Sequence, residues 1–451
     1  MLKFVGVPHY RHALLFIGRC YMILSILISL ATCLTMIAAV LFFPKINIRG
    51  ISISSYWVVT VIGASLLFLL GAVDPADVGS ALIADTAINP IKILVLFISM
   101  TVLSIFLDEL GFFRYLACAT MKRAGNSQKK LFLILYVTVS ILTVFTSNDI
   151  IILSFTPFIC YFAKNAHADP LPYLAAEFVA ANTWSMALII GNPTNIYLVT
   201  AAGEDFVSYL STMLLPTLAS GTVAFIFLYL VFRKKLSKPI TASSDEFKIQ
   251  DRVLLTVGIV HLAVCTLALA VGSYIGLQMW LISLGSAVSL FAFAVIISAI
   301  RKQPPTHLVS CIKRAPWELI PFILSMFVMV EALNESGVTQ YVSHLLGNTA
   351  PVWSYGITSF LSANLLNNIP MSVLYSSILS ANACDAAVYA TVIGSNLGAC
   401  LTPIGALAGI MYSSILKQHG LKFGYRDFLK IGLTVALPAL ITALGVLALI
   451  L

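Results

Sequence analysis

Residues Leu131 to Cys160 read LFLILYVTVSILTVFTSNDIIILSFTPFIC, two apolar segments around the polar run Thr146-Ser147-Asn148-Asp149. Each segment alone is shorter than the roughly 20 apolar residues of a membrane-spanning helix. A carboxylate in hydrocarbon is costly, so Asp149 indicates an ion or substrate path. Ser, Asn and Asp also cap helix N-termini. The stretch therefore predicts a re-entrant helical hairpin that turns at Ser147-Asn148-Asp149, a device typical of transporters. A single long tilted helix with one polar turn is the alternative.

Composition places the whole chain in a membrane. Hydrophobic residues make up 60% of the 451 residues and charged residues 10%, whereas soluble chains carry about 25% charged residues. The apolar runs are continuous, which excludes the alternating strands of a β-barrel. The net charge of +8 comes from short basic loops and does not indicate nucleic acid. The sequence predicts an all-α polytopic protein, multi-pass in the cell (inner) membrane.

The chain carries no sign of an enzyme. Its 8 cysteines are scattered singly, without metal-ligand spacing. Catalytic triads, phosphate loops and Walker motifs are absent from the sequence. We therefore expect no cofactor and no resident metal, with H⁺ or Na⁺ as the coupling ion of a transporter.

Three loops rich in Lys and Arg, 114–130, 233–238 and 301–314, set the predicted orientation. The positive-inside rule places all three in the cytoplasm. Between Lys130 and Arg233 the chain must then cross the membrane an even number of times. Two other segments account for these crossings, so 131–162 returns to its own side. The predicted segments are 20–43, 55–72, 93–110, 131–162, 172–200, 206–232, 253–272, 276–299, 317–334, 351–382, 385–416 and 427–450, with an additional interfacial or spanning segment near 2–18.

The chain reads as two related halves, an N-terminal transmembrane repeat (1–233) and a C-terminal one (253–451), joined by a cytoplasmic linker (234–252). Leu107-Asp108-Glu109-Leu110-Gly111 resembles Leu333-Asn334-Glu335-Ser336-Gly337. The turn of the first hairpin resembles Leu366-Asn367-Asn368, which predicts a second re-entrant hairpin over 351–382. The two halves begin on opposite sides of the membrane. An inverted repeat, with the substrate site between the halves, follows from this pattern.

Two further segments contain helix breaks at membrane depth. Gly191-Asn192-Pro193-Thr194-Asn195 interrupts 172–200, and Leu401-Thr402-Pro403-Ile404-Gly405 interrupts 385–416. Unwound backbone at this depth is tolerated inside protein or beside a wet cavity. The oxygens of these breaks suit Na⁺, and helix N-termini suit an anion or a polar oxyacid. The candidate substrate- and ion-binding residues are Ser147, Asn148, Asp149, Asn182, Asn192, Thr194, Asn195, Asn367, Asn368, Ser395, Asn396, Thr402 and Gly405, with Asn148, Asn195, Asn368 and Asn396 as the candidate Na⁺ ligands.

Other polar residues in the apolar segments have simpler structural explanations or are secondary candidates. Glu177 lies near the start of its segment and is expected to snorkel to the interface. His261 is expected to be a hydrogen-bonded structural histidine. Glu331 lies deeper in its segment and is a secondary candidate for the coupling group.

Several motifs resemble the arsenical pump membrane proteins, arsenite and antimonite efflux permeases of the ion transporter superfamily. These motifs are SIFLDELGFFRYL, TVFTSNDIIILSFTP, KRAPWELIPF, LLNNIP and YATVIGSNLGACLTPIGALAG, in order from residue 104 to residue 409. The resemblance implies inverted repeats, sites at hairpin tips and helix breaks, and arsenite export coupled to proton entry. It is also consistent with a homodimer and leaves room for a separate ATPase partner.

Two positions depart from that family. Acidic residues often stand there where this chain has Asn182 and Asn396, and asparagine cannot titrate but can coordinate Na⁺. The GNPTN break also resembles those of citrate and other carboxylate transporters. Three hypotheses follow: proton-coupled efflux of arsenite or antimonite, Na⁺-coupled transport of a small carboxylate or inorganic anion, and a passive channel.

Overall fold

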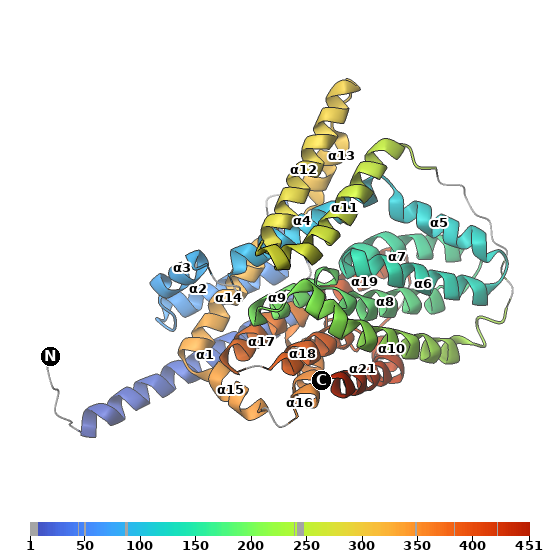
Figure 1. Ribbon diagram of the computed structural model, residues 1–451. Helices are drawn as coiled ribbons and strands as arrows, with labels where there is room; N and C mark the ends of the chain where they lie inside the picture. The colour runs from blue at the N-terminus through green and yellow to red at the C-terminus, as the bar shows by residue number, and fades with distance from the viewer. Residues whose placement is uncertain are drawn as a thin grey trace.

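The computed structural model describes residues 8–43, 45–48, 51–85, 89–238, 240, 248–347, 350–382, 384–421 and 423–451. These residues form a helical bundle, confirming the predicted helical class (Figure 1). One short antiparallel ribbon was not predicted. In it, β1 (Lys45–Ile48) pairs with β2 (Ile51–Ser54), and Lys45 lies opposite Ser54.

The first half of the chain contains α1 to α10. Their bounds are α1 Pro8–Phe42, α2 Ser55–Leu69, α3 Pro75–Ile83, α4 Pro90–Glu109, α5 Phe112–Ala124, α6 Gln128–Phe145, α7 Asn148–Asn165, α8 Leu171–Trp184, the short 3-10 helices η1 Ser185–Ala187 and η2 Ile189–Gly191, α9 Pro193–Ala202 and α10 Phe206–Phe232.

The second half contains α11 to α21. Their bounds are α11 Arg252–Gly272, η3 Ser273–Ile275, α12 Met279–Ile300, α13 Thr306–Arg314, α14 Leu319–Glu335, α15 Val338–Leu346, α16 Pro351–Leu366, α17 Asn368–Asn382, α18 Asp385–Gly398, α19 Leu407–Gln418, α20 Tyr425–Ile431, the π-helical turn η4 Gly432–Ala436 and α21 Leu437–Ile450.

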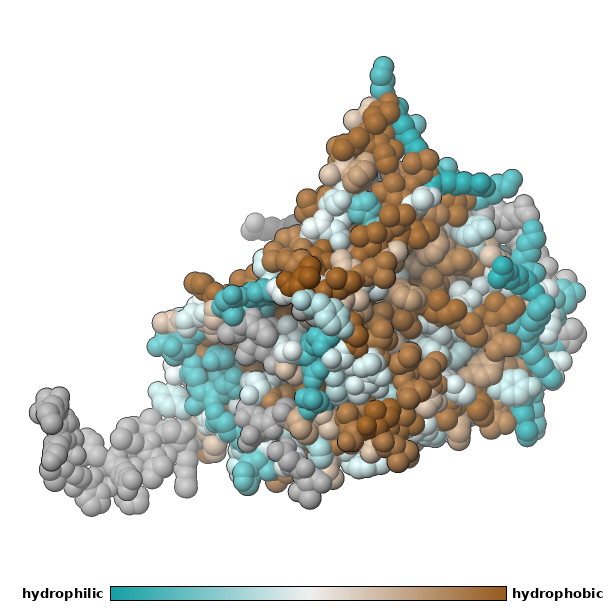
Figure 2. All heavy atoms as spheres, viewed as in Figure 1, coloured by the Kyte–Doolittle hydropathy of each residue, from teal (hydrophilic) through white to brown (hydrophobic). Residues whose placement is uncertain are grey.

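Eight helical stretches of the described chain are long and apolar enough to cross a membrane. Their outward faces carry large hydrophobic side chains, such as Val264 and Leu267 on α11 and Val288 on α12. Figure 2 shows hydrophobic residues over the projecting α12 and the neighbouring α11, with hydrophilic residues gathered at the tip of the projection. This distribution is that of a multi-pass membrane protein, because lipid covers apolar side chains at little cost.

The N-terminus differs from the prediction. Residues 8–42 form one continuous helix, α1, so residues 8–18 extend the predicted first segment and do not form an additional one. Residues 2–7 of that additional segment, and residues 239 and 241–247 of the predicted linker, lie outside the described residues.

The predicted breaks interrupt four segments. Residues 131–162 form α6 and α7 with a break at Thr146 and Ser147, so the single-helix alternative is wrong. The 172–200 segment divides into α8, η1, η2 and α9, and the 385–416 segment into α18 and α19. Near 366–368 the chain passes from α16 into α17 at Asn367, whose φ is 74°. Asparagine is enriched at positive φ, which explains this residue at the turn.

The broken helices α8 and α18 lie at the centre of the bundle. Every residue of α8 from Pro172 to Thr183 is buried, as is every residue of α18 from Ala387 to Gly398. α8 packs against α6, α7 and α10, and α18 packs closely against α16. Polar residues on α8 and α18 are therefore held away from lipid.

Candidate functional site

A hydrogen bond joins the break between α6 and α7 to α8. The N-terminal residue of α7, Asn148, is buried, and its Nδ2 donates to Oδ1 of Asn182 at 3.0 Å. Asn182 in turn donates to the carbonyl of Phe178, one helical turn back, at 2.8 Å. Ser147 precedes the helix as its N-cap residue, and Asp149 lies in the first turn with a half-buried side chain. Three candidate residues at this break thus lie beside the α8 candidate Asn182.

The break between α8 and α9 is held by its own side chains. Asn192 caps α9 by accepting from the Thr194 N–H at 3.2 Å. Asn195 donates to the carbonyls of Ser185 and Leu188 at 2.8 and 3.0 Å. At Gly191 a Cβ atom would collide with the backbone carbonyl of Ser185, so the glycine allows this close approach. The two asparagines therefore satisfy backbone groups that the unwound segment leaves free, and the glycine lets the segment approach Ser185 closely.

Asn396 connects the two halves of the chain. Its Oδ1 accepts from Ser185 Oγ and from Asn192 Nδ2, both at 2.8 Å. Its Nδ2 donates to Asn195 Oδ1 at 2.6 Å and to the carbonyl of Val392 at 2.8 Å. Because Ser185 Oγ also lies 2.9 Å from the Asn182 carbonyl, a continuous network extends from Asn148 to Asn396. We call these residues the amide network: Asn148, Asn182, Ser185, Asn192, Asn195 and Asn396.

A second cluster forms where α17 begins. Asn367 donates to the Ile404 carbonyl at 2.9 Å, and the Asn368 N–H donates to the Gly405 carbonyl at 3.0 Å. Thr402 donates to Asn364 Oδ1 at 2.6 Å, and a Cβ on Gly405 would lie 2.8 Å from the same atom. Asn364 also donates to the carbonyl of Gly398, two residues beyond Asn396. The candidates Asn367, Asn368, Thr402 and Gly405 thus meet on the α18 side of the amide network.

Sequence reasoning missed two members of these clusters, Ser185 and Asn364. Each lies within a few residues of a predicted break, at position i+3 from Asn182 and i−3 from Asn367. This spacing was a usable signal, because residues three apart share one face of a helix.

Three of the candidate residues have a buried side-chain oxygen without a hydrogen-bond partner: Thr194 Oγ1, Asn368 Oδ1 and Ser395 Oγ. Buried polar atoms are rarely left unpaired, since each costs about 1–3 kcal/mol. They belong to both halves of the chain and to three of the four breaks or their flanks. These oxygens are the groups of the candidate site that are free to bind a ligand.

The core of the described chain contains one fully buried ionisable carboxyl group and no buried Lys, Arg or His. This carboxyl is Glu177 on α8, so the expectation that Glu177 snorkels to the interface is wrong. His261 is a structural histidine as predicted, with ring nitrogens 2.8 Å from the Val257 carbonyl and 3.1 Å from Ser289 Oγ. The fully buried candidate side chains are therefore neutral amides and hydroxyls, and the half-buried Asp149 is the one carboxyl among the candidates.

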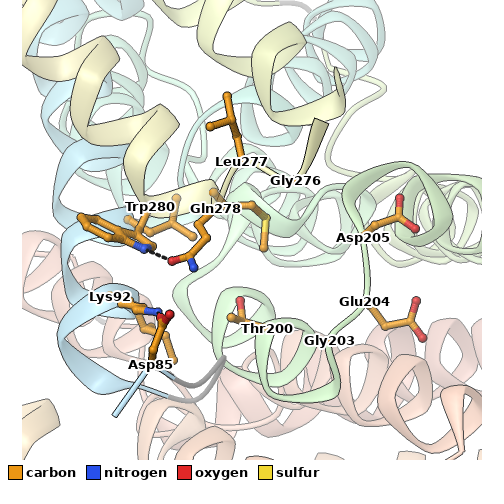
Figure 3. Close-up of a pocket in the computed structure, with 13 residues that line it drawn as sticks. Asp85, Lys92, Thr200, Gly203, Glu204, Asp205, Gly276, Leu277, Gln278 and Trp280 are labelled. Atoms are coloured by element: carbon orange, nitrogen blue, oxygen red, sulfur yellow. Dashed lines mark hydrogen bonds and ion pairs between the residues drawn. The ribbon is translucent and has the colours of Figure 1, made fainter. Parts of the chain in front are cut away.

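One pocket lies at the C-terminal end of α9 and has a volume of about 390 Å³. Figure 3 shows Thr200, Gly203 and Glu204 on one side of it and the 276–280 turn on another. Lys92 and Asp85 form an ion pair at its edge, and hydrogen bonding to Lys92 lowers the pKa of Asp85. The short helix α9 begins beside the amide network and ends at this pocket.

A second pocket of about 600 Å³ lies along α7, lined by Ser154, Pro157 and Tyr161 of that helix. Asp108 accepts from Ser154 at 2.7 Å and pairs with Arg314 at 2.6 Å. Both α4 and α11 run from one pocket to the other. The 390 Å³ pocket is lined by residues at the N-terminus of α4 and just after α11, and the 600 Å³ pocket by residues at the C-terminus of α4 and just before α11. The two pockets therefore lie at opposite ends of membrane-spanning helices, with the amide network between them.

A lipid-facing helical bundle with buried helix breaks between two opposed pockets defines a membrane transporter. The chain belongs to the citrate transporter (CitMHS) family, whose model matches residues 37–389. It is accordingly a secondary transporter and not an enzyme.

Known relatives support the same assignment. The arsenical pump membrane protein of Escherichia coli K12 is 28% identical over 423 residues, covering 89% of this chain and 94% of that protein. The putative arsenical pump membrane protein of Bacillus subtilis is 24% identical and covers 82% of this chain and 88% of that protein. The predicted resemblance is thus confirmed. The crystal structure of the Alcanivorax borkumensis YdaH transporter matches the fold with a TM-score of 0.56 at 13% identity, covering 95% of this chain and 98% of that one.

Proposed function

We propose that this transporter exports trivalent arsenic or antimony as the neutral hydroxide, coupled to proton entry. The observation that carries the proposal is the amide network, which donates and accepts hydrogen bonds but holds no cation among the described buried residues. Arsenite is an uncharged trihydroxide at neutral pH, and its hydroxyls match such donors and acceptors. A polycarboxylate would instead call for Arg or Lys, because a buried anion without a partner is strongly disfavoured. The names of the relatives support the same substrate.

The family description favours a second candidate, Na⁺-coupled transport of a small carboxylate. Asparagine oxygens at Asn148, Asn195, Asn368 and Asn396 could hold Na⁺, and the bound ions would supply the missing positive charge. The unpaired Asn368 Oδ1 is the strongest support for this alternative.

Everted membrane vesicles separate the candidates. We expect an inwardly acidic pH gradient to drive arsenite accumulation, and a Na⁺ gradient without a pH difference to drive none. Citrate accumulation driven by Na⁺, with no arsenite transport, would overturn the first proposal in favour of the second. Ohmic single-channel currents from the purified protein would overturn both and indicate the passive channel.

We infer that the two halves are inverted repeats. The order of elements from α2 to α10 matches the order from α12 to α21, and the second helix of each series, α3 and α13, has nine residues. Gly111 and Gly337 both follow a core helix with φ of 78°. At the equivalent helix ends, Asp108 accepts from Ser154 of α7 and Asn334 accepts from Ser377 of α17, both at 2.7 Å. These paired contacts support the domain boundaries at 1–233 and 253–451.

We also infer that α6–α7 and α16–α17 are re-entrant hairpins. Tyr173, in the first turn of α8, donates to Gln128 at the start of α6 at 2.9 Å. Since α8 follows α7 after a short loop, this contact supports both ends of the first hairpin lying on one side. In the second hairpin the rings of Tyr355 on α16 and Tyr375 on α17 are 6.5 Å apart.

Asp149, at the tip of the first hairpin, is then a candidate for the coupling group. We expect Asp149→Asn to retain substrate exchange and lose accumulation. A homodimer and an ATPase partner stay predictions.

A further inference from the structure

Glu177 is the fully buried carboxyl group of α8, and only one of its two oxygens accepts a hydrogen bond. Thr156 on α7 donates to its Oε1 at 2.8 Å, whereas its Oε2 has no partner. It lies five residues before Asn182, or about 7.5 Å along the helix at 1.5 Å per residue. The helices that carry Asn148 and Asn182 thus also hold Glu177 and Thr156 between them. The protonation state of this carboxyl is therefore linked to the packing of α7 against α8 at the candidate site.

Two titratable groups face Glu177. They are the Cys160 thiol, one turn beyond Thr156 on α7, and the Tyr412 phenol of α19 in the second half, whose oxygen also has no partner. Tyr412 is packed among Phe178, Phe423 and Phe428, with ring centroids 4.8 to 5.9 Å away. An aromatic wall thus closes the carboxyl off on this side.

No described cation neutralises Glu177. Of the helices that pack on α8, α6 carries Lys129 and Lys130 in its exposed first turn, and α10 has no charged residue. α7 carries Asp149 in its first turn and the exposed Lys164 in its last. α18 has only Asp385, at its far end beside Glu204. An ionised carboxylate buried without a partner is costly, whereas the protonated acid is neutral and can donate from Oε2. The enclosed surroundings of Glu177 therefore favour the protonated carboxyl, and contact with water would favour its ionisation.

We propose that Glu177 is a proton-binding site of the transport cycle, which keeps its proton while sealed and releases it into the 600 Å³ pocket along α7 when opened. Pro157 and Phe158 line this pocket next to Thr156, and His419 lines it two turns beyond Tyr412. Separation of α7 from α19 would expose Oε2 to water. The O–H bond then breaks, its electron pair stays on the carboxylate and the proton passes to water. The proposal rests on secondary transport and not on the identity of the substrate.

Infrared spectroscopy of the purified protein tests the proton site without any transport assay. Wild-type protein titrated from acid to alkaline pH should lose a carboxylic acid C=O band, and this band should be absent from Glu177→Gln. Asp77→Asn, the same chemical change at an exposed carboxylate of α3, should retain it. A wild-type spectrum without the band, or a Glu177→Gln spectrum that keeps it, overturns the proposal.

Transport measurements separate this proposal from the proposed substrate. Glu177→Gln should keep substrate exchange and lose at least 10-fold of the accumulation driven by a pH gradient, whereas Glu177→Asp should restore accumulation with a shifted pH profile. A wild-type pH profile in Glu177→Gln overturns the proton site. Failure of the Gln variant to fold while Asp folds with an unshifted profile also overturns it, in favour of a structural role. A titrating infrared band in a protein that moves citrate but no arsenite would leave Glu177 standing and remove the arsenite proposal.

Discussion

Asparagine suits the centre of this protein because one uncharged side chain both donates and accepts hydrogen bonds. Asn396 uses both ends, with Oδ1 receiving Ser185 and Asn192 and Nδ2 reaching Asn195 and Val392. An aspartate in its place would turn two donated bonds into contacts between acceptors. Each buried group left unpaired would cost about 1–3 kcal/mol. The amide thus joins the halves without placing a charge between them.

The break between α16 and α17 gives a test that separates binding from packing. Asn368→Ala should reduce transport to background with a near wild-type amount of folded protein, because Asn368 Oδ1 has no partner to lose. Asn148→Ala should also abolish transport, at a stability cost of about 1–3 kcal/mol from the unpaired Asn182 oxygen. Asn165→Ala, at the exposed end of α7, is the matched control. Wild-type transport by Asn368→Ala would reduce this break to a structural turn.

The outer carboxylates predict a pH-dependent stability. Partial burial and then the neighbouring Asp385 raise the pKa of Glu204, against the hydrogen bond from Tyr389. The native protein therefore binds this proton more tightly than the unfolded chain. Its contribution to the free energy of unfolding is full below the ordinary value of 4.5 and is lost as the pH rises through the raised native pKa.

Glu204→Gln should accordingly melt above wild type at neutral pH, and this difference should vanish in acid. Asp205→Asn should do the opposite at neutral pH, since the Ser208 hydroxyl lowers the pKa of Asp205 and stabilises its charged form. Melting temperatures of the detergent-solubilised variants across a pH series provide the measurement. A difference in melting temperature from wild type that is the same at all pH values would contradict the pKa directions given for Glu204 and Asp205.

The candidate site was predictable where the signal is local, and less so where it depends on packing. Gly191, Pro193 and Asn367 mark breaks through their own backbone preferences, and these breaks are present. The burial of Glu177 could not be read from its position near the start of a segment, because it depends on α6, α7 and α10 enclosing α8. The role of Ser185 likewise depends on the approach of α18. No sequence pattern within one segment contains that information.

At the scale of the elements, close packing of broken and unbroken helices holds the site in place. α18 lies against α16 with Gly394 at the crossing, facing Ser359 and the backbone of Gly356. Small residues let helix backbones approach within membranes, where van der Waals packing replaces the hydrophobic effect. The β1–β2 ribbon, in contrast, was overlooked because its alternation of isoleucine with polar residues covers only a few positions of an otherwise apolar chain.

Gly394→Ala tests this crossing. A Cβ there would collide with Ser359 Oγ and the Gly356 carbonyl, so α18 must move away from α16. Overpacking of this kind costs about 1–3 kcal/mol, and we expect a lower melting temperature together with reduced transport, since Asn396 is on the same helix. Gly285→Ala on α12 is the matched control, because nothing lies within 4 Å of its added Cβ. Equal melting temperatures for the two variants would show that the α16–α18 contact is loose.

At the scale of the whole molecule, the two pockets lie at the two ends of α4 and of α11, which run in opposite directions. Arg114 lines the 600 Å³ pocket together with Asp108, Glu109 and Asp251, and Arg314 pairs with Asp108 and Glu109. The predicted cytoplasmic loops 114–130 and 301–314 belong to this end. The acidic groups Asp85, Glu204 and Asp205 line the other pocket (Figure 3). Because the two basic loops are predicted to be cytoplasmic, we predict that the 600 Å³ pocket opens to the cytoplasm.

Cysteine labelling across α11 tests this orientation of the whole protein. Gln250 lines the 600 Å³ pocket just before α11, and Leu277 lines the 390 Å³ pocket just after it, with both side chains exposed. A membrane-impermeant thiol reagent should label Gln250→Cys only in everted vesicles and Leu277→Cys only in intact cells, because α11 is one of the eight spans. Unmodified protein serves as the blank for the native cysteines, most of which are buried. Labelling of both variants from one side would mean that α11 does not cross the bilayer, and the assignment of the pockets to opposite faces would be lost with it.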